Sequence, residues 1–355
     1  MSVFEDEYAE ATAEQPNPLL AGLRTGDWLD AQVFPPLSYV VPGLIPEGLT
    51  LLVGAPKIGK SWLSLAVALA AASGGCALGH VKVGPPRPVL LLALEDGDRR
   101  LQDRIRKLIP GESIPPQLNY MTRIHHGLVV QTIEAWLETI EHAMPLVLLD
   151  TLGKVMPPAM NGETTYQRDY KIASRLKEIC DNRPGMSLTG LHHDRKAAAE
   201  DFVESVSGTN GLAGAADTII VISRPRTESQ GLLKVTGRDV VEAEYAVTTK
   251  DGNWLLMGDS LEDAASIAAT IRATANLGDR SAEILRYVNK HPEGVRPGDV
   301  ARALGDLDAQ KAGTYLGRLR DSGRVRKLER GLYAPVESVE SVETETLPLV
   351  EGNNE

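Results

Sequence analysis

The segment Gly54–Ser61 constrains this chain most, because it reads Gly-Ala-Pro-Lys-Ile-Gly-Lys-Ser and matches the phosphate-binding pattern G-x-x-x-x-G-K-S/T. An apolar run, Leu49–Val53, precedes the segment, and a helical pattern, Trp62–Ala72, follows it. A strand, a glycine-rich turn and a helix N-terminus in this order point successive backbone N–H groups at one anion. The chain is therefore expected to bind the phosphates of a nucleoside triphosphate.

The expected nucleotide contacts are the loop and the residue after it: Gly54, Ala55, Pro56, Lys57, Ile58, Gly59, Lys60, Ser61 and Trp62. Lys60 would place its ammonium on the β- and γ-phosphates, which makes it a predicted catalytic residue, and the Ser61 hydroxyl would ligate Mg²⁺. ATP and Mg²⁺ are the expected cofactors. No base-reading motif separates adenine from guanine.

Charge is distributed unevenly along the 355 residues. The formal net charge is −11, yet residues 280–335 hold twelve Lys and Arg against seven Asp and Glu. With 43% apolar and 24% charged residues, the composition is that of a globular protein, long enough for one large and one small domain. A basic segment in an acidic chain indicates contact with a polyanion.

The remaining composition argues against a membrane or a disulfide framework. Cys76 and Cys180 lie far apart without ligand spacing, and both are expected to be buried apolar residues. The longest apolar run, Leu63–Ala72, is too short to cross a bilayer, and the acidic N-terminus lacks the features of a secretory signal. We expect no membrane contact and a cytoplasmic location.

From Leu49 the chain alternates apolar strand patterns with helical patterns, which predicts an α/β fold. The predicted strands are Leu49–Val53, Val89–Leu94, Leu146–Leu149, Ser187–Leu191, Thr218–Ile222 and Leu232–Thr236. The predicted intervening helices are Leu101–Ile109, Ile133–Ala143 and Tyr170–Asp181. Because the strand runs are continuously apolar, they favour a mostly parallel central sheet with helices on both faces.

A second, smaller domain is expected near the C-terminus. Helical patterns at Ser281–Lys290, Pro297–Leu304 and Ala309–Ser322 are followed by a basic hairpin pattern at 324–333, the order of a winged helix. The predicted domain boundaries are 1–30 for an acidic disordered tail, 31–260 for the nucleotide-binding core, 261–279 for a helical linker, 280–335 for the winged helix and 336–355 for an acidic disordered tail.

Three further strand ends carry candidate chemistry. Asp150 ends a buried strand where Mg²⁺ is held in such folds, although an aspartate there also caps turns. Glu95 is the candidate base for the attacking water, with Asp96 as an alternative base or a helix N-cap. His193 is preferred over His192 as a sensor of the γ-phosphate, and metal binding by the two histidines is the rival interpretation.

Two long polar segments, 156–168 and 197–214, follow these strand ends and leave the ligand-binding edge of the sheet. They contain few aromatic residues, although stacking on aromatic side chains is the usual way to bind a single strand. Positive side chains near them are expected to contact phosphates instead: Arg168, Lys171, Arg195 and Lys196.

Together these motifs resemble the RecA-like P-loop ATPase family that includes plasmid replicative helicases of the RepA type. The resemblance covers 37–257 and rests on segments 42–48, 54–61, 94–96, 149–153, 192–196 and 207–217. It implies a homo-oligomeric ring, typically a hexamer, with ATP between subunits and Glu95 as the catalytic glutamate. It also implies that Arg238 reaches into the neighbouring site, with Arg224 and Arg226 as alternatives, and that the two polar segments contact single-stranded DNA.

The C-terminal basic residues are expected to bind duplex DNA, with the helix at 309–322 in the major groove. A winged helix that docks a protein is the alternative. The favoured function is a Mg²⁺-dependent, helicase-like motor in DNA replication or recombination of a phage or plasmid type. The alternative is an ATP-switched DNA-binding regulator or loader without motor activity. A small-molecule kinase is disfavoured because it gives the basic C-terminal unit no role.

Overall fold

The computed structural model describes residues 18–125, 127–140, 143–156, 162–193, 210–274, 279–305 and 307–336. It has two compact units, Met1–Ser38 and Tyr39–Glu355. The first unit contains a 3-10 helix, η1 (Pro18–Leu20), and a short helix, α2 (Gly26–Asp30). The expected N-terminal tail, 1–30, thus includes α2 in its described part, whereas residues 1–17 lie outside the described residues.

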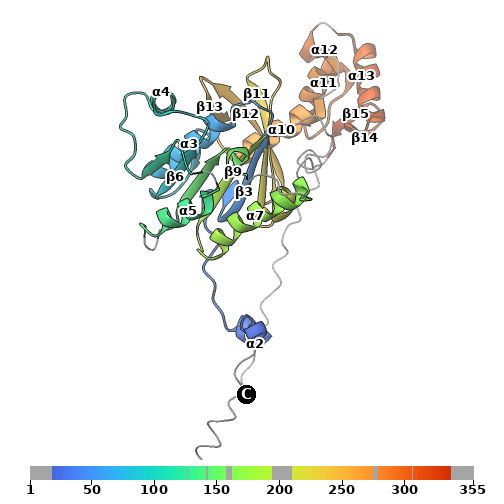
Figure 1. Ribbon diagram of the computed structural model, residues 1–355. Coiled ribbons are helices and arrows are strands. Elements are labelled where there is room, and N and C mark those ends of the chain that lie inside the picture. Colours follow the sequence, from blue (N-terminus) through green and yellow to red (C-terminus); the bar gives the residue numbers. More distant parts are fainter. Residues whose placement is uncertain are drawn as a thin grey trace, which may run out of the picture. The chain divides into compact units, whose positions relative to one another are not determined.

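The second unit is built on a nine-stranded sheet with the order β13-β12-β11-β10-β3-β9-β8-β6-β7 (Figure 1). The six strands from β10 to β7 run parallel, and β11, β12 and β13 continue the sheet in antiparallel pairs. Their bounds are β3 (Gly48–Gly54), β6 (Val89–Ala93), β7 (Leu118–Met121), β8 (Leu146–Asp150), β9 (Ser187–His193), β10 (Thr218–Ser223), β11 (Gln230–Gly237), β12 (Ala243–Lys250) and β13 (Asn253–Leu256). The predicted α/β class with a mostly parallel sheet is confirmed.

Each of the six predicted strands is present, with ends shifted by up to two residues. Apolar runs identify β3, β6, β8 and β10, which are buried along nearly their whole length, whereas β11 alternates buried and partly exposed residues. Strands β7, β12 and β13 were not predicted. In β7 three of four residues are exposed, and in β12 buried and partly exposed residues are mixed, so neither forms a continuous apolar run.

Helices cover both faces of the sheet and enclose two apolar cores (Figure 1). One core packs α3 (Lys60–Ser73) and α4 (Asp98–Leu108) on the sheet, together with part of α10 (Leu261–Thr274). The other core packs α5 (Val129–Leu137), α6 (Leu152–Val155), α7 (Thr165–Asp181) and α9 (Asn210–Ala215) on the opposite face. The predicted helix Ile133–Ala143 is wrong at its C-terminal end, since a turn follows α5 at 138–140.

Two short antiparallel pairs complete this unit: β1 (Tyr39–Val41) with β2 (Ile45–Pro46), and β4 (Cys76–Ala77) with β5 (Val81–Lys82). Cys180 is buried as predicted, but the prediction for Cys76 is wrong, because its side chain is exposed. Successive residues of a strand face opposite sides, and in β4 the neighbouring Ala77 takes the buried side. Both cysteines are free.

The C-terminal part contains α11 (Asp279–Asn289), α12 (Pro297–Leu304), α13 (Ala309–Asp321) and a hairpin of β14 (Val325–Glu329) and β15 (Leu332–Pro335). These elements share an apolar core of their own, to which α13 contributes Leu316 and Leu319. A single antiparallel bridge, Val295 to Tyr333, ties the segment before α12 to the hairpin. The described helices include none long and apolar enough to cross a membrane. The predicted acidic tail, 336–355, lies outside the described residues from 337 onward.

Candidate functional site

The phosphate loop connects the end of β3 to the start of α3, as the sequence predicts. Lys57 and Gly59 take positive φ angles of 65° and 113°, which turn the loop between strand and helix. Trp254 of β13 donates a hydrogen bond from Nε1 to the Gly59 carbonyl at 3.2 Å. A Cβ atom at Gly59 would lie 2.9 Å from that nitrogen, so the buried indole also excludes a side chain there. Trp254 is a site residue that the sequence did not indicate.

Lys60 is 4% exposed and its ammonium lies inside the loop. Nζ donates hydrogen bonds to the carbonyls of Gly54 at 2.7 Å and Ala55 at 3.1 Å. It also lies 3.0 Å from Nδ1 of His193. The ammonium thus stands at the centre of the loop, where an anion held by the N–H groups would meet it.

Asp150, at the end of β8, is 5% exposed. Burial raises the pKa of this carboxyl to about 6, a hydrogen bond with Ser61 opposes the rise, and the negative charges of Glu95 and Asp96 add to it. Oδ1 of Asp150 has no hydrogen-bond partner among the described residues. A buried carboxylate oxygen without a partner, beside the hydroxyl at the helix start, matches the oxygen ligands that Mg²⁺ prefers. The donor set therefore fits the expected metal.

Glu95 follows β6, at the same edge of the sheet as Asp150. The Thr151 hydroxyl donates a hydrogen bond to Glu95 Oε1 at 3.2 Å, and Nε2 of His193 lies 3.9 Å from the same oxygen. The alternative for Asp96 as N-cap is wrong, because Gly97 occupies that position in α4. Asp96 instead accepts hydrogen bonds from Arg100 and Arg104 and is nearly buried. Of the two acids, Glu95 alone contacts the side chains around the phosphate loop in the described structure.

His193 lies between Lys60 and Glu95 and contacts both. Burial lowers the pKa of the imidazole, the charge of Lys60 lowers it further, and Glu95 opposes both effects. The ring is therefore neutral near pH 7. His193 pairs with Gly54 in the sheet register and His192 with Val53, so alternation along β9 directs them to opposite faces. The described residues include no cluster of three His, Cys, Asp or Glu side chains that could hold a metal, which leaves the metal alternative unsupported.

Arg238 lies away from these residues, at the opposite edge of the sheet. Its Nη1 is 3.4 Å from Oδ1 of Asp217, and Oδ2 of the same residue accepts a hydrogen bond from Leu49 N at the start of β3. The phosphate loop begins at the other end of this seven-residue strand, about 20 Å away at 3.3 Å per residue. The structure thus does not bring Arg238 to the phosphate loop of its own chain. The side chain is 61% exposed.

Arg224, one of the alternatives to Arg238, lies at the carboxyl end beside the phosphate loop. It helps to line a cleft of about 420 Å³ that no sequence motif indicated. The lining residues are Ala55, Ile58, Ser223, Arg224, Pro225, Glu228, Gln230, Gly231, Leu232 and Ile271. The cleft is of the size of small-molecule sites and adjoins the loop, so it is the candidate place for the nucleoside.

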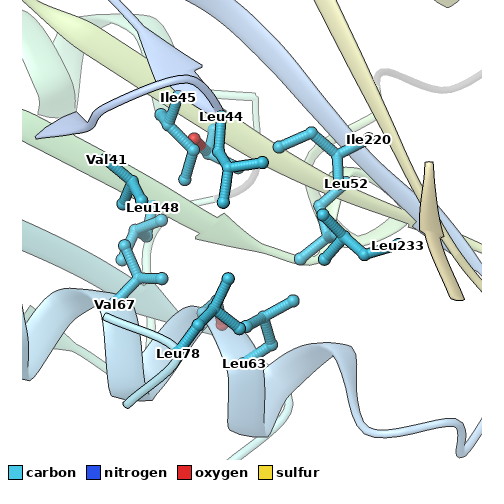
Figure 2. A pocket seen from close by; sticks show the side chains of 12 residues that line it. Val41, Leu44, Ile45, Leu52, Leu63, Val67, Leu78, Leu148, Ile220 and Leu233 are labelled. Carbon is cyan, nitrogen blue, oxygen red and sulfur yellow. The ribbon is translucent and has the colours of Figure 1, made fainter. Parts of the chain in front are cut away.

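A second cavity, of about 30 Å³, lies beneath α3 and is drawn in Figure 2. Leu63 and Val67 of α3 face Leu52 and Leu148 of the sheet across it (Figure 2). Its volume is that of one or two water molecules, and its walls belong to the apolar core. It is a packing gap rather than a ligand site.

The buried lysine at a helix start, the buried carboxylate of Asp150 beside Ser61 and the glycine-turned loop define a P-loop nucleotide-binding protein. Residues 13–199 match the AAA domain family, and because this match covers more than half of the chain, the chain belongs to that family of P-loop ATPases. In the sheet, strand β9 lies between the strand that leads into the phosphate loop and the strand that ends in Asp150.

Solved structures with similar folds share little sequence with the chain. A DnaB-like replicative helicase is 13% identical with a TM-score of 0.47, covering 59% of this chain and 57% of that one. A KaiC-like protein from Pyrococcus horikoshii OT3 is 12% identical with a TM-score of 0.45, covering 63% of this chain and 100% of that one. The RadB recombinase is 14% identical with a TM-score of 0.44, covering 61% of this chain and 93% of that one. Similarity at this level does not define a function.

Proposed function

We propose that the chain is a Mg²⁺-dependent ATPase that assembles into a ring, typically a hexamer, and acts on DNA in the cytoplasm as a helicase-like motor. Replication or recombination of phage or plasmid type is the setting that its sequence motifs favour. The observation that carries the proposal is the convergence of Lys60, Asp150, Glu95 and His193 at one edge of the sheet.

Each of these side chains has a distinct role in the proposed reaction. Mg²⁺, when bound by Ser61 and Asp150, supplies positive charge against the β- and γ-phosphates. Lys60 exchanges its carbonyl partners for phosphate oxygens. Glu95, oriented by the Thr151 hydroxyl, accepts the proton of the attacking water. Neutral His193 contacts both Lys60 and Glu95, so its position responds to the loss of the γ-phosphate.

Arg238 supports the ring in the proposal. An arginine stabilises charge on the transferred phosphoryl group, but Arg238 is about one strand length from its own phosphate loop. It is exposed, and Val241 in the same β11–β12 turn is 81% exposed. Both features suit a turn that enters the site of a second copy of the chain.

The C-terminal elements support contact with duplex DNA. Exposed positive side chains lie on α13 and on the hairpin: Lys311, Arg318, Arg320, Arg326, Lys327 and Arg330. Because α11 to β15 share their own apolar core, these charges are presented by a folded unit rather than a tail. We interpret this unit as a winged helix. The same observation favours the second candidate, an ATP-switched regulator or loader in which duplex binding is the output.

The test replaces Glu95 by glutamine, which keeps the shape of the side chain but removes its basicity. Glu95→Gln is expected to bind Mg²⁺-ATP like the parent, by calorimetry, and to lose most of its turnover, by phosphate release. Equal turnover would remove Glu95 as the base, and a parent without any nucleotide binding would refute the proposal. Strand separation on a forked duplex distinguishes the candidates, because a motor unwinds it with ATP and a switch only binds it.

A further inference from the structure

Two tyrosines on the first two turns of α7 form an exposed aromatic surface. Tyr166 and Tyr170 are four residues apart, and their rings are stacked with centroids 6.0 Å apart and planes inclined by 11°. Tyr166 is 51% exposed and Tyr170 is 46% exposed. Neither hydroxyl has a hydrogen-bond partner among the described residues. Both side chains are therefore partly accessible on the surface of α7.

The backbone beneath the tyrosines is held from two sides. Thr164 begins α7 with a capping box, in which its hydroxyl accepts a hydrogen bond from Gln167 N at 3.2 Å. Helix α9 packs on the same turns, and a Cβ atom at Gly211 would lie 2.5 Å from Tyr166 O and 2.8 Å from Tyr170 N. Glycine permits this close approach, so the aromatic pair stands on a fixed surface.

The position of the pair links it to the nucleotide site. Near its other end, α7 is anchored by the ion pair of Lys177 with Asp217 at 2.7 Å, at the edge where β3 begins. Tyr166 lies 11 residues earlier, about 16 Å along the helix toward the opposite edge. The chain enters α7 from the strand that ends in Asp150, and it enters α9 from the strand that ends in His193. Tyr166 therefore lies toward the edge of the sheet at which the strands of Asp150 and His193 end. The connecting residues 157–161 and 194–209 lie outside the described part of the chain.

Positive charge accompanies the rings. Lys171 and Arg175 are exposed on α7, and neither makes an ion pair with a described residue. Arg168 pairs with the buried Asp169 at 3.4 Å. Lys171 and Arg175 therefore remain as the exposed cations of α7 that form no ion pair with a described residue. Aromatic faces beside unpaired cations are the combination that binds a nucleic-acid strand, since bases stack on the rings and phosphates meet the charges.

We propose that Tyr166 and Tyr170 stack the bases of single-stranded DNA, with Lys171 contacting its backbone. This inference rests on the proposed function and specifies how the core holds its DNA. It adds base stacking to the phosphate contacts that the sequence interpretation expected for segments with few aromatic residues. Tyr166 lies in the first polar segment, 156–168, and Tyr170 follows it, but in the structure both residues belong to α7, on which α9 packs.

The experiment measures the binding of a dye-labelled oligo-dT strand by fluorescence anisotropy, with the full chain and a non-hydrolysable Mg²⁺-ATP analogue. Tyr166→Ala and Tyr170→Ala are each expected to weaken binding by roughly 5- to 100-fold, whereas the matching Phe variants keep the ring and the affinity. Tyr120→Ala is the matched control, because Tyr120 is 47% exposed on β7 and outside this surface. The slope of affinity against salt should change with Lys171→Gln and stay unchanged in the tyrosine variants.

The outcomes separate this inference from the proposed function. A parent chain that binds no oligo-dT in any nucleotide state refutes the action on DNA itself. A parent that binds, with both alanine variants equal to it, overturns the inference alone. If the alanine variants bind oligo-dT more weakly and also form a smaller oligomer than the parent in sedimentation, the inference is overturned, since the rings would then lie between copies of the chain. Photocrosslinking of an iodouracil strand to Tyr166 or Tyr170 in the parent supports it without any substitution.

Discussion

The buried carboxyl of Asp150 leads to a prediction in which the chemistry of the site opposes the stability of the fold. Its pKa is raised from the ordinary value of 3.8 to about 6, chiefly by burial. A raised pKa means that the folded state disfavours the charged carboxylate, so folding is penalised more as pH rises from about 4 to about 6. At pH 7.5 and without metal, a shift of this size corresponds to about 3 kcal/mol.

Asp150→Asn removes the charge and keeps the shape, so without metal the variant is expected to be more stable than the parent. For a core of this size, the gain corresponds to a rise in melting temperature of roughly 3 to 10 °C at pH 7.5. The gain should fall to about half at pH 5, where the parent carboxyl is largely protonated in the folded state. Tryptophan fluorescence during thermal unfolding in EDTA measures both values.

The matched control is Asp217→Asn, which alters an equally buried carboxylate that is paired with Lys177 at 2.7 Å and bonded to Leu49 N at 3.0 Å. This substitution removes an ion pair and should lower the melting temperature. Addition of Mg²⁺ and nucleotide should stabilise the parent but not Asp150→Asn, whose hydrolysis should be lost. If Asp150→Asn melts at or below the parent temperature at pH 7.5, the buried charge of Asp150 does not destabilise the folded state and the reasoning is refuted.

Two further predictions concern how the active residues are positioned. Thr151→Val removes the hydrogen bond to Glu95 and should lower kcat by roughly 5- to 30-fold with KM unchanged. Thr151→Ser should retain most of kcat, and adding Thr151→Val to Glu95→Gln should cause no further loss of kcat. Arg238→Ala should keep nucleotide affinity and lose turnover, and mixing it with inactive Lys60→Ala should restore some phosphate release. Mixtures that stay as inactive as their components would place Arg238 outside the site of the neighbouring chain.

The parts of this protein that the sequence predicts are those that depend on local pattern. The phosphate loop and the strand that ends in Asp150 follow from glycine spacing and apolar runs, because parallel strands that are buried on both faces are mostly apolar. The approach of Lys60 to His193 follows as well, because adjacent parallel strands end at the same edge. The same reasoning favoured Glu95 without excluding Asp96, and the ion pair of Asp96 with Arg104 could not be read from the sequence.

The features that the sequence does not predict depend on contacts between distant residues. Trp254 lies 195 residues from Gly59, in a short strand that half-buried neighbours conceal, and no local signal joins them. Tyr166 and Tyr170 are adjacent on one helix face, but their exposure and the approach of Gly211 follow from packing. Cys76 was mistaken for a core residue because residue type alone does not tell which face of a two-residue strand is buried.

Lys60 donates hydrogen bonds to the carbonyls of Gly54 and Ala55, so an anion that binds its ammonium has to replace these two partners. An ammonium that already donates to two carbonyls gains little from a singly charged anion such as chloride, since each new contact replaces an old one. A polyphosphate carries enough negative charge to replace the two carbonyls as partners of the ammonium. Discrimination against common small anions would then begin with the hydrogen bonds that Lys60 makes before a ligand binds, independently of any contact to the nucleotide base.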